Sequence, residues 1–206
     1  MVNEMNFYMF IKPLTIFNTR VLSPYKIEYG KENLNHDEPV IYCSNHRHFY
    51  DPFLIAIVVK KQVFFMAKKE LFEIKILRPI IKALGAFPVD RHKPDFSSIR
   101  TATQLIEENK SIGIFPEGTR NKTSFGVQQL HEGAFWLAMK CGVPIVPMFI
   151  DNRGPFHRMY YFVGEKIVPE SVGQKRITSE MRQATEETLF QAMKKLEEMA
   201  HKKYEK

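Results

Sequence analysis

The stretch SNHRHFYDP, from Ser44 to Pro52, holds the residue types best suited to chemistry: two histidines and one aspartate. His46 stands five positions before Asp51. On a continuous helix this spacing would separate the two side chains by roughly 140° around the axis, so they can meet only across a turn. A carboxylate that holds one imidazole nitrogen fixes the tautomer and makes the other nitrogen a better base. The stretch therefore allows a general base with its orienting carboxylate.

Asp51 also has a purely structural interpretation. Asp and Pro are favoured at the N-cap and first position of a helix, so Asp51 and Pro52 predict a helix start.

A third alternative uses His46 and His48 as two ligands of a metal ion in a phosphoester hydrolase. The other histidines lie in unrelated segments, with no ExxH or CxxC companion. We therefore predict no metal site, and spacing alone leaves the base and the cap interpretations open.

The second stretch is IFPEGTR, from Ile114 to Arg120, in which a strand leads into a turn that contains glycine. Gly118 can adopt a positive φ and let the backbone approach a ligand, while Arg120 offers a fork suited to phosphate. Together with Glu117 and Thr119 these residues favour an anion-binding loop. The alternative is an ordinary turn with a surface salt bridge.

The third stretch is GAFPVDR, which ends at Arg91. Alone it is a weak signal. With Arg120 it would place two guanidinium groups near one histidine, an arrangement suited to positioning a phosphorylated alcohol. Glu117 would then pair with one of these arginines or accept a hydrogen bond from a substrate hydroxyl.

These stretches follow predicted strands of an α/β fold. We predict a mostly parallel, mixed central sheet of about seven strands flanked by helices, with an N-terminal amphipathic helix and a C-terminal helix. In such sheets ligands bind beyond the carboxyl ends of the strands, where the three polar loops fall. The predicted strands are 25–30, 39–45, 63–68, 86–90, 111–118, 143–150 and 159–167, and the helices are 52–60, 74–84, 95–109, 129–141 and 178–203.

Residues 1–22 form a separate segment with an apolar stripe that includes Phe7, Leu14 and Phe17. The stripe can pack on the domain or lie in a lipid interface, and the pattern does not separate the two. The segment lacks a basic start and a cleavage site, so we predict no signal peptide. The longest uninterrupted apolar run, Phe53 to Val59, is too short to span a bilayer.

The charge of the chain, +7, is concentrated between Lys60 and Arg100, where ten bases and four acids give +6 (10 − 4). This window favours an acidic partner such as anionic lipid, a phosphorylated substrate or an acidic carrier protein, unless it is only a solvated face. No nucleic-acid-binding repeat is present.

The two cysteines show no CxxC spacing and indicate a reducing compartment. No GxSxG motif and no Walker-type or dinucleotide-binding glycine loop occurs, so neither a covalent acyl-enzyme nor a cofactor is predicted.

Four blocks in chain order resemble the glycerolipid acyltransferases of the PlsC type: NHxxxxD from Asn45 to Asp51, GAFPVDR, FPEGTR and VPIVP. The resemblance covers roughly residues 25–170. It implies that His46 is the general base, that Asp51 orients it, and that an acceptor alkoxide attacks a thioester directly. It also implies that the loop from Glu117 to Arg120, with Arg91, binds glycerol phosphate.

The function implied by this resemblance is transfer of a fatty acyl group to the sn-2 hydroxyl of 1-acyl-sn-glycerol 3-phosphate (lysophosphatidic acid), giving phosphatidic acid. The donor would be acyl-CoA or acyl-carrier protein, with no cofactor or metal. Glycerol 3-phosphate or another lysolipid remains an alternative acceptor. We expect a peripheral protein at the cytoplasmic face of the cell membrane, built from segment 1–22 and an acyltransferase domain over 23–206.

Overall fold

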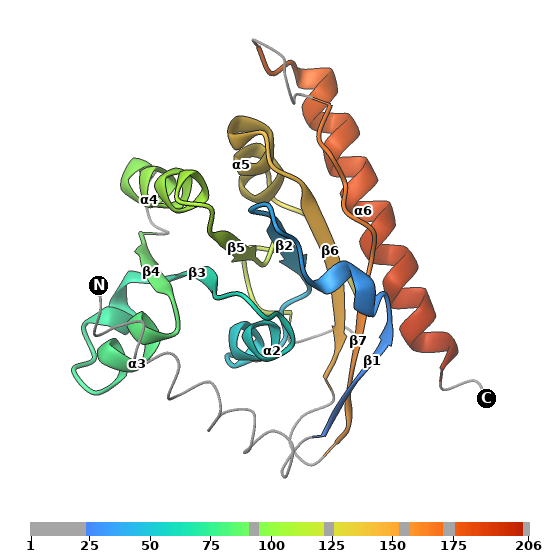
Figure 1. Ribbon diagram of the computed structural model, residues 1–206, viewed down its shortest axis with the longest axis horizontal. Helices are drawn as coiled ribbons and strands as arrows, with labels where there is room; N and C mark the ends of the chain where they lie inside the picture. Colours follow the sequence, from blue (N-terminus) through green and yellow to red (C-terminus); the bar gives the residue numbers. More distant parts are fainter. Residues whose placement is uncertain (1–23, 91–94, 122–125, 153–156, 171–175, 204–206) are drawn as a thin grey trace.

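Seven strands and five helices make up most of the part of the chain described by this computed structural model (Figure 1). It describes residues 24–90, 95–121, 126–152, 157–170 and 176–203. The predicted N-terminal helix and the predicted phosphate ligand Arg91 lie outside these ranges. The strands are Tyr25–Tyr29 (β1), Ile41–Ser44 (β2), Val63–Lys68 (β3), Ala86–Val89 (β4), Ser111–Ile114 (β5), Ile145–Asp151 (β6) and Met159–Val163 (β7).

The helices follow the strands in alternation. They are Asp51–Val58 (α2), Leu77–Ala83 (α3), Phe96–Glu107 (α4), Gly133–Cys141 (α5) and Ser179–Lys202 (α6), with short 3-10 turns at Lys31–Leu34 (η1) and Lys69–Phe72 (η2). No helix among the described residues is long and apolar enough to cross a membrane.

The strands form one sheet in the order β1-β7-β6-β2-β5-β3-β4. Each neighbouring pair is parallel except β6 and β7, which run antiparallel. This confirms the predicted α/β class with its mostly parallel, mixed sheet. The catalytic candidates follow β2, which lies between β5 and β6 at the centre of the sheet.

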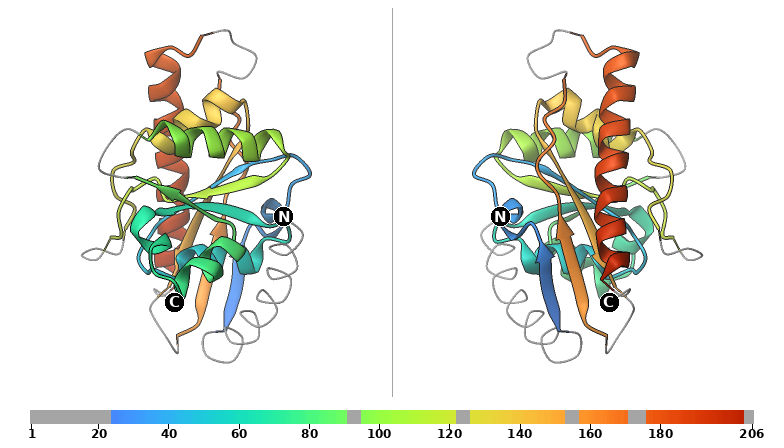
Figure 2. Two further views of the ribbon diagram at one scale, coloured as in Figure 1. Left: turned by 90° about the vertical axis from the view of Figure 1, so that its left-hand side faces the viewer. Right: turned by 90° about the vertical axis from the view of Figure 1, so that its right-hand side faces the viewer.

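Helices cover both faces of the sheet because successive strand residues point to opposite sides. Ile41 and Cys43 of β2 pack into one core with α4, α5 and α6. Tyr42, between them, packs into the second core with α2 and η1. The two side views show α4 and α5 on one side of the sheet and α2 on the other (Figure 2). The carboxyl ends of β2 and β5 are therefore held between two packed layers.

The contact between Gly113 of β5 and Phe65 of β3 generates a stability prediction. A Cβ atom on Gly113 would lie 2.0 Å from Cε1 of Phe65, so Gly113→Ala should push that ring out of its place. Overpacking of this kind lowers the free energy of unfolding by about 1–3 kcal/mol, which urea denaturation can measure. The control is Gly133→Ala, whose Cβ would meet no heavy atom within 4 Å and should not destabilise. Equal stability of the two variants would contradict this account.

Candidate active site

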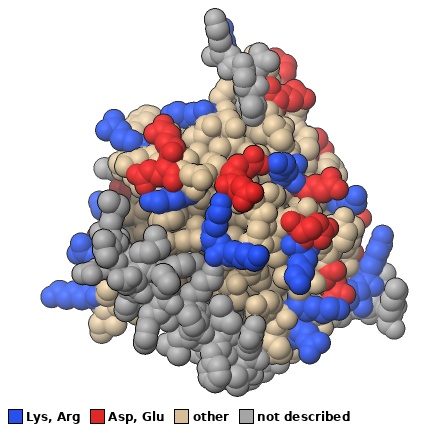
Figure 3. All heavy atoms as spheres, viewed as in Figure 1, with Lys and Arg blue, Asp and Glu red and all other residues tan. Residues whose placement is uncertain are grey.

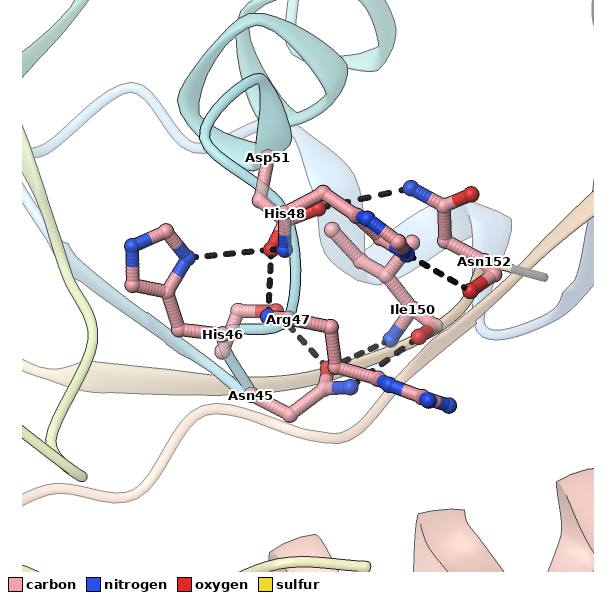
Figure 4. A network of polar contacts seen from close by, with 8 residues as sticks. Asn45, His46, Arg47, His48, Asp51, Ile150 and Asn152 are labelled. Carbon is pink, nitrogen blue, oxygen red and sulfur yellow. Dashed lines mark hydrogen bonds and ion pairs between the residues drawn. The ribbon is translucent and has the colours of Figure 1, made fainter. Parts of the chain in front are cut away.

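His46 and Asp51 meet across the turn that joins β2 to α2. Nδ1 of His46 lies 3.0 Å from Oδ2 of Asp51. The same oxygen accepts backbone hydrogen bonds from Arg47 and His48, at 2.7 and 2.8 Å (Figure 4). The Asp51 carboxylate can only accept hydrogen bonds, so Nδ1 of His46 must be the donor. In the neutral imidazole, Nε2 then carries the free lone pair. The turn therefore presents a base of defined tautomer.

Asp51 is not the N-cap of α2, so that part of the sequence interpretation is wrong. The N-cap position is Tyr50, and Asp51 and Pro52 are the first two residues of the helix. The physical reason is the direction of the Asp51 carboxylate. It accepts hydrogen bonds from amides that precede it, at Arg47 and His48, rather than from the open amides of the first helical turn.

Two asparagines tie the catalytic turn to the end of β6. The side chain of Asn45 donates to the carbonyl oxygen of Ile150 at 3.0 Å and accepts from its amide at 2.8 Å. Nδ2 of Asn152 lies 3.4 Å from Oδ1 of Asp51. The chain therefore leaves β2 in a fixed direction. Sequence analysis missed both roles; the position of Asn45 beside His46 was the one available signal.

His48 does not share a site with His46. Its Nε2 lies 3.3 Å from the carbonyl oxygen of Asn152, and its ring stacks on Tyr50 with centroids 5.1 Å apart. In Figure 4 the two imidazoles point to opposite sides of the turn. Among the described residues, no group of three or more His, Cys, Asp or Glu is placed to hold a metal ion. The two histidine side chains therefore do not converge on a common site.

The His46 ring borders a cavity of about 640 Å³, a volume typical of small-molecule sites. One wall is apolar and includes Trp136 and Leu137 of α5. Asp90 and Thr119 provide polar groups at the ends of the β4 and β5 strands. Since Nδ1 is held by Asp51, the base can act toward this cavity through Nε2.

Phe115 packs on a face of the imidazole, whereas Asp51 holds its edge at Nδ1. The two rings are stacked, with centroids 4.0 Å apart and planes 19° apart. Phe115 follows the last residue of β5, so the strand that leads to the FPEGTR loop also supports the base. Sequence analysis assigned Phe115 no role, because its stacking depends on the pairing of β5 beside β2.

The FPEGTR loop is a tight turn held by tertiary hydrogen bonds. Gly118 has a φ of 68°, the positive value predicted for it. The amide of His131 donates to the carbonyl oxygen of Pro116 at 2.7 Å, and the amide of Asn121 donates to that of His46 at 2.7 Å. These bonds fasten the loop to the catalytic turn and to the segment that leads into α5.

The predicted substrate-binding residues of this loop fall in three environments. Gly118 and Thr119 line the cavity. Glu117 is buried and does not line it, while Arg120 is exposed outside it. No ion pair joins Glu117 to Arg120, and Arg91 is outside the described residues. The structure therefore brings His46, Asp51, Gly118 and Thr119 to one cavity, but it does not show two arginines converging there.

Glu117 has an unusual environment for a carboxyl group. It is 2% exposed, and within the described ranges neither carboxyl oxygen has a hydrogen-bond partner. Burial raises the pKa of Glu117 to about 7. The backbone of His46 lowers this pKa, and the negative charge of Asp51 raises it further. Glu117 therefore takes up a proton close to neutral pH.

Comparison with known proteins matches this arrangement to one family. A family model described as "Acyltransferase" matches residues 26–151, a range that holds the catalytic turn, the cavity loops and β6. The chain belongs to this acyltransferase family.

Individual relatives agree with the assignment. A 1-acyl-sn-glycerol-3-phosphate acyltransferase of Bacillus subtilis is 40% identical over 120 residues, which cover 58% of this chain and 59% of the relative. One of Streptococcus pneumoniae is 36% identical over 123 residues, covering 59% of this chain and 44% of the relative. The match thus spans less than two thirds of these curated acyltransferases.

A solved structure supports the fold over nearly the whole length. The crystal structure of the 1-acyl-sn-glycerophosphate acyltransferase PlsC from Thermotoga maritima has a TM-score of 0.67 and 21% identity to this acyltransferase. The likeness covers 97% of this chain and 95% of the other. At this identity it shows that the two chains share a fold.

The buried carboxyl of Glu117 predicts a pH dependence of stability. Its pKa in the folded state, about 7, lies above the ordinary value of 4.5, so the folded chain holds a proton that the unfolded chain releases between these values. Stability therefore falls as the pH rises through this window. Glu117→Gln removes the titration and should become more stable than the wild type by about 1–3 kcal/mol above the window. Urea denaturation across the pH range measures the difference.

The control for this experiment is Glu198→Gln, at an exposed position of α6, which should follow the wild type. A Glu117→Gln variant whose advantage over the wild type is the same at every pH would show that Glu117 does not titrate there.

Proposed function

We propose that this protein transfers a fatty acyl group from a thioester to the sn-2 hydroxyl of 1-acyl-sn-glycerol 3-phosphate, giving phosphatidic acid. The observation that carries the proposal is the His46 imidazole, held at Nδ1 by buried Asp51 and bordering a cavity of about 640 Å³. Membership of the acyltransferase family gives the reaction class. The named activity of the curated relatives supports this choice of acceptor.

The reaction follows from the geometry of the base. Nε2 of His46 takes the proton of the acceptor hydroxyl as its oxygen attacks the thioester carbonyl carbon. Asp51 stabilises the imidazolium that forms. The C–S bond then breaks, the ester remains on the acceptor, and the leaving thiolate takes the proton back from Nε2. Only the histidine changes its protonation state, so the residues supply acid–base catalysis without a covalent intermediate.

The acceptor phosphate would bind at the loops that follow β4 and β5. Gly118 and Thr119 line the cavity there, and we propose that Arg120 and Arg91 supply positive charge to the phosphate. Acyl-CoA and acyl-carrier protein both fit as donors, and neither a metal nor a cofactor takes part in the steps above. Because the acceptor and product are lipids, we infer that the protein works at a membrane surface as a peripheral protein.

The direct test supplies lysophosphatidic acid with acyl-CoA and, in parallel, with acyl-carrier protein, and measures phosphatidic acid. Glycerol 3-phosphate and other lysolipids, tested with the better donor, decide the acceptor. Failure to acylate any of these acceptors with either donor would overturn the proposal.

Removing the base should abolish catalysis without unfolding the chain. His46→Ala should lower kcat by about 10²–10⁴-fold or more, the usual contribution of a general base. Asp51→Asn should lower it as well, because an amide cannot stabilise the imidazolium. His48→Ala is the matched control from the same turn and should keep most of the activity. A folded His46→Ala protein with wild-type kcat would refute this mechanism.

Arg120 should act on binding more than on chemistry. A charged hydrogen bond to phosphate contributes about 1.5–3 kcal/mol, so Arg120→Ala should raise the acceptor KM by about 10–100-fold, with a smaller change in kcat. Arg182→Ala on α6 is the control and should leave both constants unchanged. If Arg120→Ala instead lowers kcat alone, Arg120 does not hold the phosphate.

A further inference from the structure

An exposed apolar surface lies beside the catalytic turn. Ile76 is 83% exposed, Phe49 is 72% and Ile74 is 51%, and Leu71 and Ile80 are each 36% exposed. We call these five residues the α3 patch. Single exposed apolar residues are ordinary, but five large ones on neighbouring segments indicate a binding surface. η2 and α3 pack against each other, and these elements with the segment between them carry every patch residue except Phe49, which lies in the turn after β2.

The α3 patch is continuous with the interior near the active site. Phe49 and Leu71 both line a small, mainly apolar cavity of about 90 Å³ between α2, β3 and α3. Met66 lines this cavity and also the larger cavity at His46. Phe49 itself belongs to the turn between His46 and Asp51. Phe49 and Leu71 thus meet at this cavity, and the other patch residues follow Leu71 in the segment that leads into α3 and on α3 itself.

Positive charge surrounds the patch. Five exposed bases lie in the segment 68–82, against two acids, Glu70 and Glu73, which gives a local charge of +3 (5 − 2). Glu70 is 3.1 Å from Lys68. The bases are Lys68, Lys69, Lys75, Arg78 and Lys82. Figure 3 shows several Lys and Arg side chains at the left-hand edge, on the side where α3 lies in Figure 1, whereas acidic and basic side chains alternate over α6 on the right.

We infer that the α3 patch docks the protein onto a bilayer that contains anionic lipid. Isoleucine and phenylalanine side chains can enter the acyl region, while lysine and arginine extend to phosphate headgroups. A second copy of the chain fits less well, because a symmetric contact would bring two patches of charge +3 together. The inference rests on the proposed function, since the acceptor there is a lipid.

Docking in this orientation would place the turn that carries His46 at the lipid surface. Phe49, between the base and its carboxylate in sequence, would be the contact from the catalytic turn. A lysolipid could then reach the base without leaving the membrane surface completely. The docking surface would in this way determine from which side the acceptor approaches.

The test measures partitioning of the full chain onto vesicles of phosphatidylcholine with and without phosphatidylglycerol. One variant combines Ile74→Glu with Ile76→Glu, and the other combines Lys75→Glu with Arg78→Glu. Each lost base should weaken binding to anionic vesicles by about fivefold, so the charge variant, which also gains two acids, should bind at least about 25-fold less tightly. The apolar variant should lose at least about tenfold. Added salt should weaken the wild type more than the charge variant.

The controls carry matched changes elsewhere on the surface. Val168→Glu alters another exposed apolar residue, 56% exposed, and Lys195→Glu with Lys202→Glu makes the same charge change on α6. Both should bind vesicles as the wild type does. Equal binding by the patch variants and the wild type, or no anionic preference in the wild type, would overturn the inference. Dimerisation without lipid that the patch variants abolish would assign the patch to a second copy and also overturn it.

A soluble assay separates this inference from the proposed function. Patch variants that fold with an unchanged thermal transition should acylate a monomeric short-chain lysophosphatidic acid with wild-type kcat. If the wild type docks but makes no product with this substrate, the proposed function fails and the docking surface stands. If it makes product but the patch variants dock normally, only the docking inference fails.

Discussion

The active site depends on the hydrogen bonds made by the buried carboxylate of Asp51. Asp51 is 2% exposed, and a buried charge is tolerated only when hydrogen bonds replace its water. One oxygen meets the His46 imidazole and the amides of Arg47 and His48, and the other faces the amide of Asn152. Turn conformation, ring orientation and the link to the end of β6 are consequently a single unit. A change in any of these features would remove a hydrogen bond from the Asp51 carboxylate.

A second buried carboxyl shows what happens without such donors. Glu117 lies close enough to Asp51 for that negative charge to raise its pKa. Among the described residues no group donates a hydrogen bond to its side chain. The two neighbouring acids therefore differ in environment, because one carboxyl is hydrogen-bonded and the other is buried with no side-chain donor in the described part of the chain. Burial raises the pKa of Glu117 and so disfavours a second negative charge close to Asp51.

The elements of the sheet could be predicted because apolar runs and turn residues mark them locally. All seven predicted strands are present, and the helices differ from prediction mainly in their first residues. The spacing of His46 and Asp51 indicated that they could meet only across a turn, and the family resemblance implied that they pair. The role of Asp51 as a cap was predicted wrongly because the fold of the turn determines which amides donate to its carboxylate. The burial of Glu117 and the stacking of Phe115 on His46 depend on loops meeting across the sheet, which no local pattern records.

The turn between β2 and α2 borders two cavities of different character. The larger cavity extends toward α4 and α5 and has polar groups at its rim, while the smaller one lies under α2 and α3 and is mainly apolar. Met66 contributes to both walls. In the reaction proposed above, an amphipathic acceptor would meet a thioester at His46. The turn after β2 contributes His46 to the larger cavity and Phe49 to the smaller one, so a single loop at the carboxyl end of a central strand borders both environments.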